Sequence, residues 1–345
     1  MSGRQEKVVV VAVNLEGFDS AFAPVRDLSD RVELVHAAYE TSWEEVSARR
    51  SGRPSPRPEK LTPELLSALE RAEVVFGFVL PRNLPQLAPR LRWVATPATG
   101  FDQLRGCGVL ESGIPVTSVG GLFAPDIAEH VFASVLFLAK RLRTFEDQRR
   151  RREWRMRRVE FLHGKTLGLV GVGNIGKAVA ARAKAFGMRV VGVGRSSSEG
   201  RTVPGVDRLL ERRELPMLLR EADVVVVAVA DTPETRGMIG EREIGEMKPT
   251  AYLVNVSRGT VLDEPALVHA LESGRLRGAA LDVFETEPLP PESPLWELEN
   301  VLVTPHVAAN AEDYMPRAIA QFAENLRRYL EGKPLENRYD PVRGY

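Results

Sequence analysis

The apolar positions of the chain recur with two different spacings, which predict an alternation of buried strands and helices. Short runs that are apolar almost without interruption are typical of strands in a parallel sheet that is covered on both faces. In the first third of the chain these runs cover residues 7–13, 31–37 and 74–80, and further strands are predicted within residues 91–104 and 114–121. The proline- and arginine-rich stretch before Pro63 indicates an exposed loop that leads into a helix.

The remainder of the chain repeats the pattern of strand and helix with short connections. Helical segments lie between the predicted strands, for example at residues 263–276. The predicted strands cover residues 166–170, 188–193, 222–229, 251–257, 278–284 and 300–305. This regular alternation predicts an α/β fold with two Rossmann-like, doubly wound domains built on parallel sheets.

Two longer helical patterns indicate how the domains are connected. Apolar residues recur at helical spacing over residues 125–143, which predicts one amphipathic helix, and a second pattern covers residues 311–332. A chain that leaves the first domain by one helix and returns by the other makes that domain discontinuous. We therefore expect a substrate-binding domain of residues 1–118 and 310–345, a dinucleotide-binding domain of residues 119–309, and an active site in the cleft between them.

Composition limits the classes of partner that the chain is expected to bind. Its 345 residues include 47 lysines and arginines and 47 aspartates and glutamates, so the formal net charge is zero. A balanced charge gives no electrostatic argument for binding to nucleic acid or to a membrane surface. The arginine-rich stretch at residues 149–158 is an exception, which we interpret as a solvated helix end and linker rather than a polyanion site.

Cysteine content and hydropathy bear on the cellular compartment. Cys107 is the only cysteine, so an intrachain disulfide is impossible and a reducing, cytoplasmic location is expected. The sequence has no apolar run of about 18 residues and no signal-peptide cleavage pattern. It also lacks a Cys/His cluster with the spacing of metal ligands. We therefore expect no membrane span and no metal site.

A glycine fingerprint, G-x-G-x-x-G, follows the strand predicted at residues 166–170 and opens a helical segment. In this context Gly171 allows a tight turn and Gly173 lets a pyrophosphate approach the backbone. Gly176 lets the helix pack closely on the strand. The N–H groups of Asn174 and Ile175 then point toward the bound anion at the N-terminus of the helix. The pattern predicts a dinucleotide site.

The position that usually contacts the adenosine ribose indicates which nucleotide is bound. In many dinucleotide sites an acidic residue near the end of the second strand accepts hydrogen bonds from the ribose hydroxyls. This chain has Gly194 there, followed by Arg195 and Ser196, which can bind a 2′-phosphate instead. The sequence therefore predicts that NADP(H) is preferred and NAD(H) is possible. The alternative is that Arg195 only stacks on the adenine and that both cofactors are accepted.

Three further loops carry charged or titratable residues directly after predicted strands of the second domain. They are Arg258 in the first loop, Asp282, Glu285 and Glu287 in the second, and His306 in the third. In an open α/β sheet, ligands bind beyond the carboxyl ends of the strands. We therefore expect these side chains to converge on one site.

These residue types suit the reduction of a 2-oxo acid. The planar guanidinium of Arg258 can bind the substrate carboxylate, and the imidazole of His306 can protonate the developing alkoxide. A neighbouring carboxylate would favour the imidazolium form; Glu287 is the candidate, with Glu285 as the next choice. A bound nicotinamide would supply the hydride. Among the other histidines, His130 in the first long helix is expected at the domain interface.

The order and the length of these motifs resemble those of a known family. The chain contains GKTLGLVGVGNIGKAVA, TPETRGMIG, MKPTAYLVNVSRGTVLDEPALVHALESGRLRGAALDVFETEPLP and LVTPH, all within residues 164–306. On these motifs the chain resembles the D-isomer-specific 2-hydroxyacid dehydrogenases, and the resemblance extends over nearly its whole length. The pair Gly194-Arg195 resembles the glyoxylate/hydroxypyruvate reductase branch of that family.

The resemblance implies roles for particular residues. It assigns the substrate carboxylate to Arg258, acid/base chemistry to His306, and the partner of that histidine to Glu287, the second glutamate of the E-x-E pattern. It places Asp282 at the carboxamide side of the nicotinamide. Further cofactor contacts are implied for Val229, Ala230, Thr235, Val256 and Ser257, and substrate contacts through backbone N–H groups for Thr99 and Gly100. Members of the family are usually homodimers, so a homodimer is expected.

The combined expectation is an NAD(P)H-dependent oxidoreductase that interconverts a small 2-oxo acid, such as glyoxylate or hydroxypyruvate, and the D-2-hydroxy acid. Two alternatives stay open. One is an NAD-linked dehydrogenase for another 2-hydroxy acid, of the phosphoglycerate type. The other is a corepressor-like binding module that senses the dinucleotide. Modules of that kind resemble the family in fold and retain the residues that correspond to Arg258, Glu287 and His306.

Overall fold

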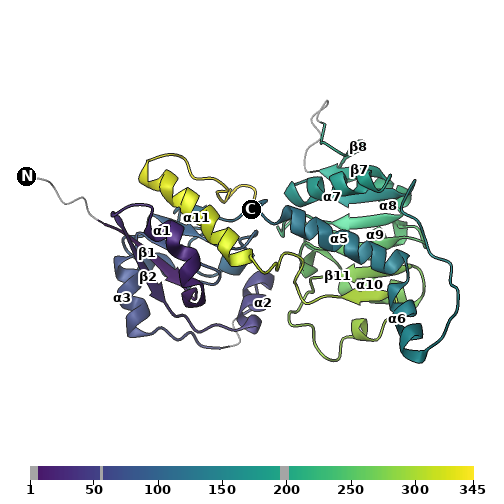
Figure 1. The fold of residues 1–345 in the computed structure, drawn as a ribbon, viewed down its shortest axis with the longest axis horizontal. Helices are drawn as coiled ribbons and strands as arrows, with labels where there is room; N and C mark the ends of the chain where they lie inside the picture. Colours follow the sequence, from purple (N-terminus) through teal and green to yellow (C-terminus); the bar gives the residue numbers. More distant parts are fainter. Residues whose placement is uncertain (1–6, 55–56, 195–201) are drawn as a thin grey trace, which may run out of the picture. The chain divides into compact units, whose positions relative to one another are not determined.

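The computed structural model describes residues 7–54, 57–194 and 202–345 of the chain (Figure 1). Contacts between residues divide the chain into two compact units. The first unit extends to Leu122 and takes in residues 311–345, and the second consists of residues 123–310. Each unit contains one sheet, and each is described by itself.

The sheet of the first unit has five strands, all parallel, in the order β2-β1-β3-β4-β5. Its strands are β1 (Val8–Val13), β2 (Val32–Ala37), β3 (Val74–Gly77), β4 (Trp93–Ala95) and β5 (Val116–Thr117). The register aligns Val10 of β1 with Val74 of β3. Every residue of β1 is buried, as expected for a central strand with both faces covered.

Helices cover both faces of this sheet. They are α1 (Ala23–Arg26), α2 (Trp43–Ser51), α3 (Pro63–Arg71), α4 (Leu84–Leu87) and α11 (Tyr314–Leu330), with the 3-10 turns η1 (Glu16–Phe22) and η2 (Asp102–Leu104). On one face, Phe322 of α11 stacks on Phe76 of β3 with ring centroids 4.3 Å apart. On the other face, Leu65 and Leu69 of α3 are fully buried. Figure 1 shows the C-terminal α11 beside α1, and residues of the two helices are in contact.

Local signals fix where two of these helices begin. The Ser42 side chain accepts a hydrogen bond from the N–H of Glu45 at the start of α2. The Thr62 side chain accepts in the same way from the N–H of Leu65 at the start of α3. Such caps satisfy backbone N–H groups that a helix leaves unpaired, and each is typically worth about 1 kcal/mol. Helix α2 ends where Gly52 adopts a left-handed conformation with φ of 73°.

The sheet of the second unit has seven strands, all parallel, in the order β12-β11-β10-β9-β6-β7-β8. Its strands are β6 (Thr166–Val170), β7 (Arg189–Gly194), β8 (Arg208–Glu211), β9 (Val224–Val227), β10 (Tyr252–Asn255), β11 (Gly278–Leu281) and β12 (Val301–Val303). The strand order reverses between β6 and β9, which are neighbours. In a doubly wound sheet, the carboxyl ends of the strands at such a reversal form the usual ligand site.

Helices precede the second sheet or connect its strands. They are α5 (Ala124–Ala139), α6 (Leu142–Arg151), α7 (Asn174–Ala185), α8 (Leu215–Glu221), α9 (Glu241–Glu246) and α10 (Glu264–Glu272), with the 3-10 turns η3 (Arg212–Glu214), η4 (Gly259–Val261) and η5 (Pro294–Trp296). Helix α5 packs against α7 and against β10 and β11. Two parallel sheets with helices packed on them confirm the predicted α/β class.

The helix predicted over residues 125–143 is interrupted in the structure. Helix α5 ends at Ala139, and α6 begins at Leu142. Between them Arg141 has φ of 53°, in the left-handed region. A residue with a side chain rarely adopts this conformation, and it breaks the ladder of helical hydrogen bonds. The apolar spacing of the sequence continues through the break, which is why it predicts one helix rather than two.

Two shorter elements also differ from the prediction. Strand β8 was not predicted, because it is an edge strand in which only Leu210 is buried and the apolar run is correspondingly short. Of the strand predicted within residues 91–104, only β4 (Trp93–Ala95) forms, and the residues after Gly100 include the 3-10 turn η2.

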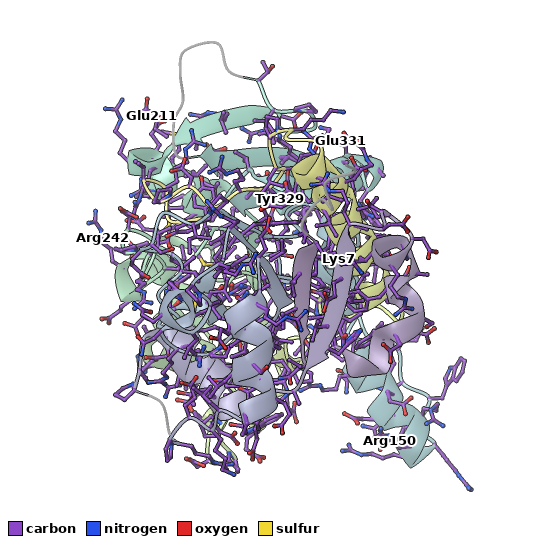
Figure 2. All side chains as sticks on the ribbon, turned by 90° about the vertical axis from the view of Figure 1, so that its left-hand side faces the viewer. Lys7, Arg150, Glu211, Arg242, Tyr329 and Glu331 are labelled. Atoms are coloured by element: carbon purple, nitrogen blue, oxygen red, sulfur yellow. The ribbon has the colours of Figure 1, made fainter. Side chains whose placement is uncertain are left out.

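The arginine-rich stretch at residues 149–158 begins in α6 and continues without regular structure after Arg152. Figure 2 shows Arg150 projecting outward from α6. Beyond the helix, the side chains of Trp154 and Met156 are 97% and 95% exposed. Within the described residues, every helix is too short or too polar to span a bilayer.

Candidate active site

The turn between β6 and α7 carries the three glycines of the fingerprint, and each has a different environment. Gly171 has φ of 105°, and a Cβ there would lie 2.5 Å from the carbonyl oxygen of Ala228. A Cβ at Gly176 would lie 2.2 Å from the carbonyl oxygen of Gly171, so both positions require glycine. A Cβ at Gly173, by contrast, would meet no atom of the described residues within 4 Å. Protein atoms therefore close the turn on two sides, and the backbone at Gly173 can be approached by a ligand.

Helix α7 begins directly after this turn, at the reversal point of the sheet. Its N-cap is Gly173, whose carbonyl accepts the first hydrogen bond of the helical ladder from the N–H of Lys177. The N–H groups of Asn174 and Ile175 precede that ladder. N–H groups at a helix N-terminus bind phosphate, because they donate hydrogen bonds at the positive end of the helix dipole. The turn and the helix therefore fit the pyrophosphate of a dinucleotide.

The loop after β9 carries the other cofactor residues predicted on this side of the sheet. Val229 lies beside the glycine turn, since its Cγ1 would be 3.0 Å from a Cβ placed on Gly171. The Thr235 hydroxyl donates to the carbonyl of Ala230 at 2.6 Å and accepts from the N–H of Thr232 at 2.9 Å. This hydroxyl therefore closes the loop on itself and holds Val229 and Ala230 next to the turn.

The end of β7 is described as far as Gly194. A Cβ at Gly194 would lie 3.1 Å from Cγ2 of Val172, in the strand-to-helix turn. Arg195 and Ser196, from which the preference for NADP(H) was predicted, lie outside the described residues.

Asn255, at the end of β10, organises the loop that carries Arg258. Its buried side-chain oxygen accepts from the N–H of Ser257 at 3.0 Å and from the Ser257 hydroxyl at 2.7 Å. Its side-chain amide donates to the carbonyl of Arg258 at 3.0 Å. The guanidinium of Arg258 donates to the Ser257 carbonyl at 2.7 Å, and Val256 and Ser257 are both buried. The loop is therefore held in one shape before any ligand binds.

Gly259 lets this loop lie against the loop after β11. A Cβ at Gly259 would lie 1.8 Å from the carbonyl carbon of Phe284 and 2.2 Å from the nitrogen of Glu285. No residue with a side chain fits there without moving one of the two backbones. The close approach brings the loop of Arg258 beside the loop of Glu287.

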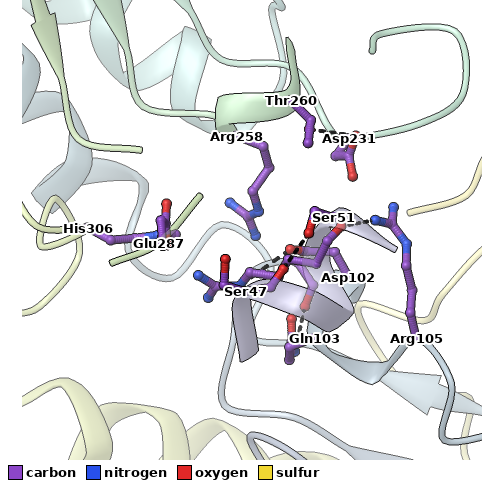
Figure 3. Close-up of polar contacts among 12 residues, drawn as sticks. Ser47, Ser51, Asp102, Gln103, Arg105, Asp231, Arg258, Thr260, Glu287 and His306 are labelled. Atoms are coloured by element: carbon purple, nitrogen blue, oxygen red, sulfur yellow. Dashed lines mark hydrogen bonds and ion pairs between the residues drawn. The ribbon is translucent and has the colours of Figure 1, made fainter. Parts of the chain in front are cut away.

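The loops after β11 and β12 bring Glu287 and His306 together (Figure 3). Nδ1 of His306 lies 2.8 Å from Oε2 of Glu287, and Oε1 of Glu287 accepts from the N–H of Phe284 at 3.2 Å. Because a carboxylate only accepts, the pair places a proton on Nδ1 and makes Nε2 the nitrogen that can act on a substrate. The two side chains are 25% and 15% exposed, so the pair is sheltered and still accessible. Of the two glutamates considered, Glu287 makes this contact.

Asp282 is buried, and its carboxylate binds the loop that carries His306. Oδ1 accepts from the Thr304 hydroxyl at 2.6 Å and from the N–H of Val307 at 2.9 Å. Oδ2 accepts from the N–H of Ala308 at 2.9 Å. The resemblance to the family implied only a contact with the nicotinamide carboxamide. In the structure, three hydrogen bonds of this carboxylate already hold the loop in place.

Sequence reasoning missed three residues that shape the site. His130, expected at the domain interface, has Nε2 3.2 Å from Oγ1 of Thr304 and 3.8 Å from Oδ1 of Asp282. Asn255 and Gly259 lock the shape and the position of the Arg258 loop, as described above. The only local signal for them is their place in the motif N-x-x-R-G that follows a predicted strand.

Thr99 and Gly100, predicted to bind the substrate, lie in the first unit, in the turn after β4. The carbonyl of Gly100 accepts from the side-chain amide of Gln103 at 3.1 Å. The same amide donates to the hydroxyl of Thr96 at 3.0 Å, and Gln103 is fully buried. Thr99 and Gly100 are therefore held, half-buried, at the carboxyl edge of the first sheet.

The sequence matches a known family over the second unit and a known enzyme over most of the chain. The sequence profile of the D-isomer specific 2-hydroxyacid dehydrogenase, NAD binding domain, matches residues 132–308. A glyoxylate reductase of Aeropyrum pernix is 39% identical over 283 residues, which cover 78% of this chain and 83% of that relative.

Two solved structures are similar over almost the whole chain. A D-isomer specific 2-hydroxyacid dehydrogenase from Xanthobacter autotrophicus Py2, in complex with NADPH and MES, has a TM-score of 0.79 at 29% identity and covers 99% of this chain and 100% of its own. An NADPH-dependent glyoxylate/hydroxypyruvate reductase from Sinorhizobium meliloti, in complex with NADP and sulfate, has a TM-score of 0.78 at 26% identity with the same coverage. The chain therefore belongs to the D-isomer specific 2-hydroxyacid dehydrogenases, which are NAD(P)-dependent oxidoreductases.

Proposed function

We propose that the chain is an NADPH-preferring reductase that converts a small 2-oxo acid, of the size of glyoxylate or hydroxypyruvate, to the D-2-hydroxy acid. The observation that carries the proposal is the 2.8 Å contact between His306 and Glu287, in the same unit as Arg258 and the glycine turn. A paired imidazole and a guanidinium suit a substrate whose carboxylate lies next to a carbonyl. The glyoxylate reductase of Aeropyrum pernix supports this substrate class.

Each of the three residues has a separate role in the proposed reduction. The guanidinium of Arg258 binds the substrate carboxylate with parallel hydrogen bonds and so orients the carbonyl. Glu287 accepts a hydrogen bond from Nδ1 of His306 and stabilises the imidazolium form. Nε2–H of His306 then protonates the carbonyl oxygen as negative charge develops on it. The nicotinamide, when bound, supplies the hydride.

The glycine turn is proposed to hold the pyrophosphate of the cofactor. The N–H groups of Asn174 and Ile175 donate to its oxygens, and the space beside Gly173 admits it. Val256 and Ser257 would flank the nicotinamide at the end of β10.

The proposed preference for NADPH has two supports. Arg195 and Ser196 are residue types that bind a 2′-phosphate, although both lie outside the described residues. The structures from Xanthobacter autotrophicus and Sinorhizobium meliloti contain NADPH and NADP. Within this proposal the second unit binds the dinucleotide, and the first unit binds the substrate through the backbone near Thr99 and Gly100.

A substrate panel run with both reduced cofactors tests the proposal. Oxidation of NADPH or NADH is followed by absorbance with glyoxylate, hydroxypyruvate and bulkier 2-oxo acids, with His306→Ala as the inactive control. We expect turnover of the smaller acids, with kcat/KM at least about tenfold higher for NADPH than for NADH. Turnover that prefers NADH by the same factor would contradict the cofactor preference. Tight NADPH binding without turnover of any acid would favour the dinucleotide-sensing module.

A further inference from the structure

Helix α5 holds His130 against the loop that carries His306. Nε2 of His130 lies 3.2 Å from the hydroxyl of Thr304 and 3.8 Å from Oδ1 of Asp282. The helix itself packs on β10 and β11, the two strands that precede the loops of Arg258 and Asp282. A side chain from a helix early in the second unit thus meets a loop near the end of that unit.

The chemistry of these partners fixes the direction of their hydrogen bonds. The carboxylate of Asp282 only accepts, so the single proton of the Thr304 hydroxyl, 2.6 Å away, is donated to it. The hydroxyl oxygen must then accept from its other partner, His130. His130 therefore carries a proton on Nε2. A chain of two hydrogen bonds runs from α5 through Thr304 to Asp282.

Asp282 in turn holds the backbone around His306. Its carboxylate accepts from the N–H groups of Val307 and Ala308, and its carbonyl accepts from the N–H of His306 at 2.8 Å. His306 has φ of 54°, a region that residues with a side chain rarely adopt. Such a conformation is kept only where several surrounding contacts together hold the backbone in it. Three of the contacts that fix this backbone meet at Asp282.

We propose that His130 is a positioning residue for His306. By donating to Thr304, it aligns the Asp282 carboxylate, which holds residues 304–308 in the shape that aims the His306 ring. Without this donor, the Thr304 hydroxyl and the carboxylate can turn together and the loop loses one fixed point. The catalytic consequence rests on the proposed function, whereas the effect on the loop does not.

Hydrogen exchange at the loop tests this contact without turnover. His130→Phe keeps a ring and removes the donor, whereas His130→Gln keeps an N–H donor near the position of Nε2. In His130→Phe we expect the amides of Val307 and Ala308 to exchange about tenfold faster than in the native protein, and in His130→Gln within about threefold of it. His269→Phe, on α10 and outside this network, is the matched control and leaves exchange at the loop unchanged.

Steady-state kinetics give the second readout. In His130→Phe we expect kcat to fall about tenfold while KM for the 2-oxo acid changes less than about threefold, because the proton donor is misaligned and Arg258 is untouched. His130→Gln restores kcat, which a purely structural loss would not. If the native protein turns over no 2-oxo acid, the proposed function fails, and the exchange result still decides the role of His130 in the loop.

A Thr304→Val background shows whether His130 acts through the hydroxyl. There, His130→Phe should not accelerate loop exchange further, because the hydrogen-bond chain is already broken. An equal acceleration in both backgrounds would overturn the inference. So would native exchange in His130→Phe, or exchange in His130→Gln as fast as in His130→Phe. Should His130→Phe not fold, native-like exchange in His130→Gln with faster exchange in Thr304→Val supports the inference, and the reverse overturns it.

Discussion

His306 and Glu287 lie 19 residues apart in the sequence and meet because each follows a strand of one parallel sheet. Their contact of 2.8 Å stabilises positive charge on the imidazole, since an ionised carboxylate favours the cation beside it. Reduction of a carbonyl consumes a proton, so the enzyme needs the imidazolium form. The charge of Glu287 should therefore affect the rate of reduction.

Glu287→Gln tests this dependence, because it keeps the shape of the side chain and removes its charge. The imidazolium loses its stabilising partner, so kcat for reduction should fall about tenfold or more. Initial rates with NADPH at a saturating concentration of the 2-oxo acid measure kcat. Glu285→Gln is the matched control and should leave kcat unchanged. A native kcat in Glu287→Gln with a lowered kcat in Glu285→Gln would make Glu285 the partner instead.

Arg258→Lys separates charge from geometry at the proposed carboxylate site. Lysine keeps the positive charge but replaces the planar fork of donors by a single ammonium. We expect KM for the 2-oxo acid to rise about tenfold, since one charge-assisted hydrogen bond is lost, with the Kd of NADPH unchanged. Arg150→Lys, on the exposed end of α6, is the control. A weaker Kd for NADPH with an unchanged KM would place Arg258 at the cofactor rather than at the substrate.

How far single residues could be predicted depends on whether their signal is local. Arg258 and His306 follow strands directly, so the rule that ligands bind beyond the carboxyl ends of strands selects them as candidates. Gly259 matters because it lies against the backbone of Phe284. No local pattern in the sequence predicts that contact. His130 meets Thr304 across 174 residues of sequence, and nothing in the periodicity of its helix marks that face as functional.

At the scale of elements, the turn between β6 and α7 separates two glycines that the fold requires from a third that the proposed pyrophosphate site requires. Gly176→Ala would place a Cβ 2.2 Å from the carbonyl of Gly171, whereas Gly173→Ala would meet no described atom. We expect Gly176→Ala to lower the free energy of unfolding by about 1–3 kcal/mol, because the helix and strand must separate. Gly173→Ala should leave that free energy within about 0.5 kcal/mol of the native value.

The same pair of variants should differ in the opposite way in cofactor binding. Gly173→Ala fills the space that the pyrophosphate is proposed to use, so we expect the Kd of NADPH to rise at least about tenfold. Thermal unfolding without cofactor and a fluorescence titration with NADPH measure the two effects. Gly245→Ala in α9, where a Cβ also meets no described atom, is the control for both. Native NADPH affinity in Gly173→Ala would remove the pyrophosphate from this turn.

The elements themselves were predictable where the apolar signal was long. The buried strands of both sheets read as nearly continuous apolar runs, and most of them lie where predicted. The break between α5 and α6 at Arg141 was not predictable, because a left-handed φ at an arginine does not change the spacing of the apolar residues around it. Strand β8 was not predictable, because it is an edge strand with one buried residue and so has no long apolar run in the sequence.

At the scale of the whole chain, the α/β class with two parallel sheets followed from the regular alternation of strands and helices. The return of the chain to the first unit through α11 was also visible as a second long helical pattern, whose Phe322 now stacks on Phe76 of β3. The oligomeric state does not follow from this alternation, because it depends on which exposed surfaces are apolar. Those surfaces are known only from the structure.

The segment after α6 supplies such a surface. Trp154 and Met156 are 97% and 95% exposed in the single chain. Apolar area left in water costs about 25 cal/mol per Å² relative to burial. Aromatic residues and methionine are also enriched in the cores of protein interfaces. We therefore expect the chain to be a homodimer in which a second copy covers residues 153–158.

Replacement of both apolar side chains by charge tests the assembly. Trp154→Glu combined with Met156→Glu should shift the mass measured by light scattering from dimer to monomer at micromolar concentration, because two carboxylates from each copy would have to be desolvated in the interface. Trp43→Glu, at a 58% exposed tryptophan of the first unit, is the matched control and should remain dimeric. A native chain that is monomeric across this concentration range would mean that Trp154 and Met156 face water in the working enzyme.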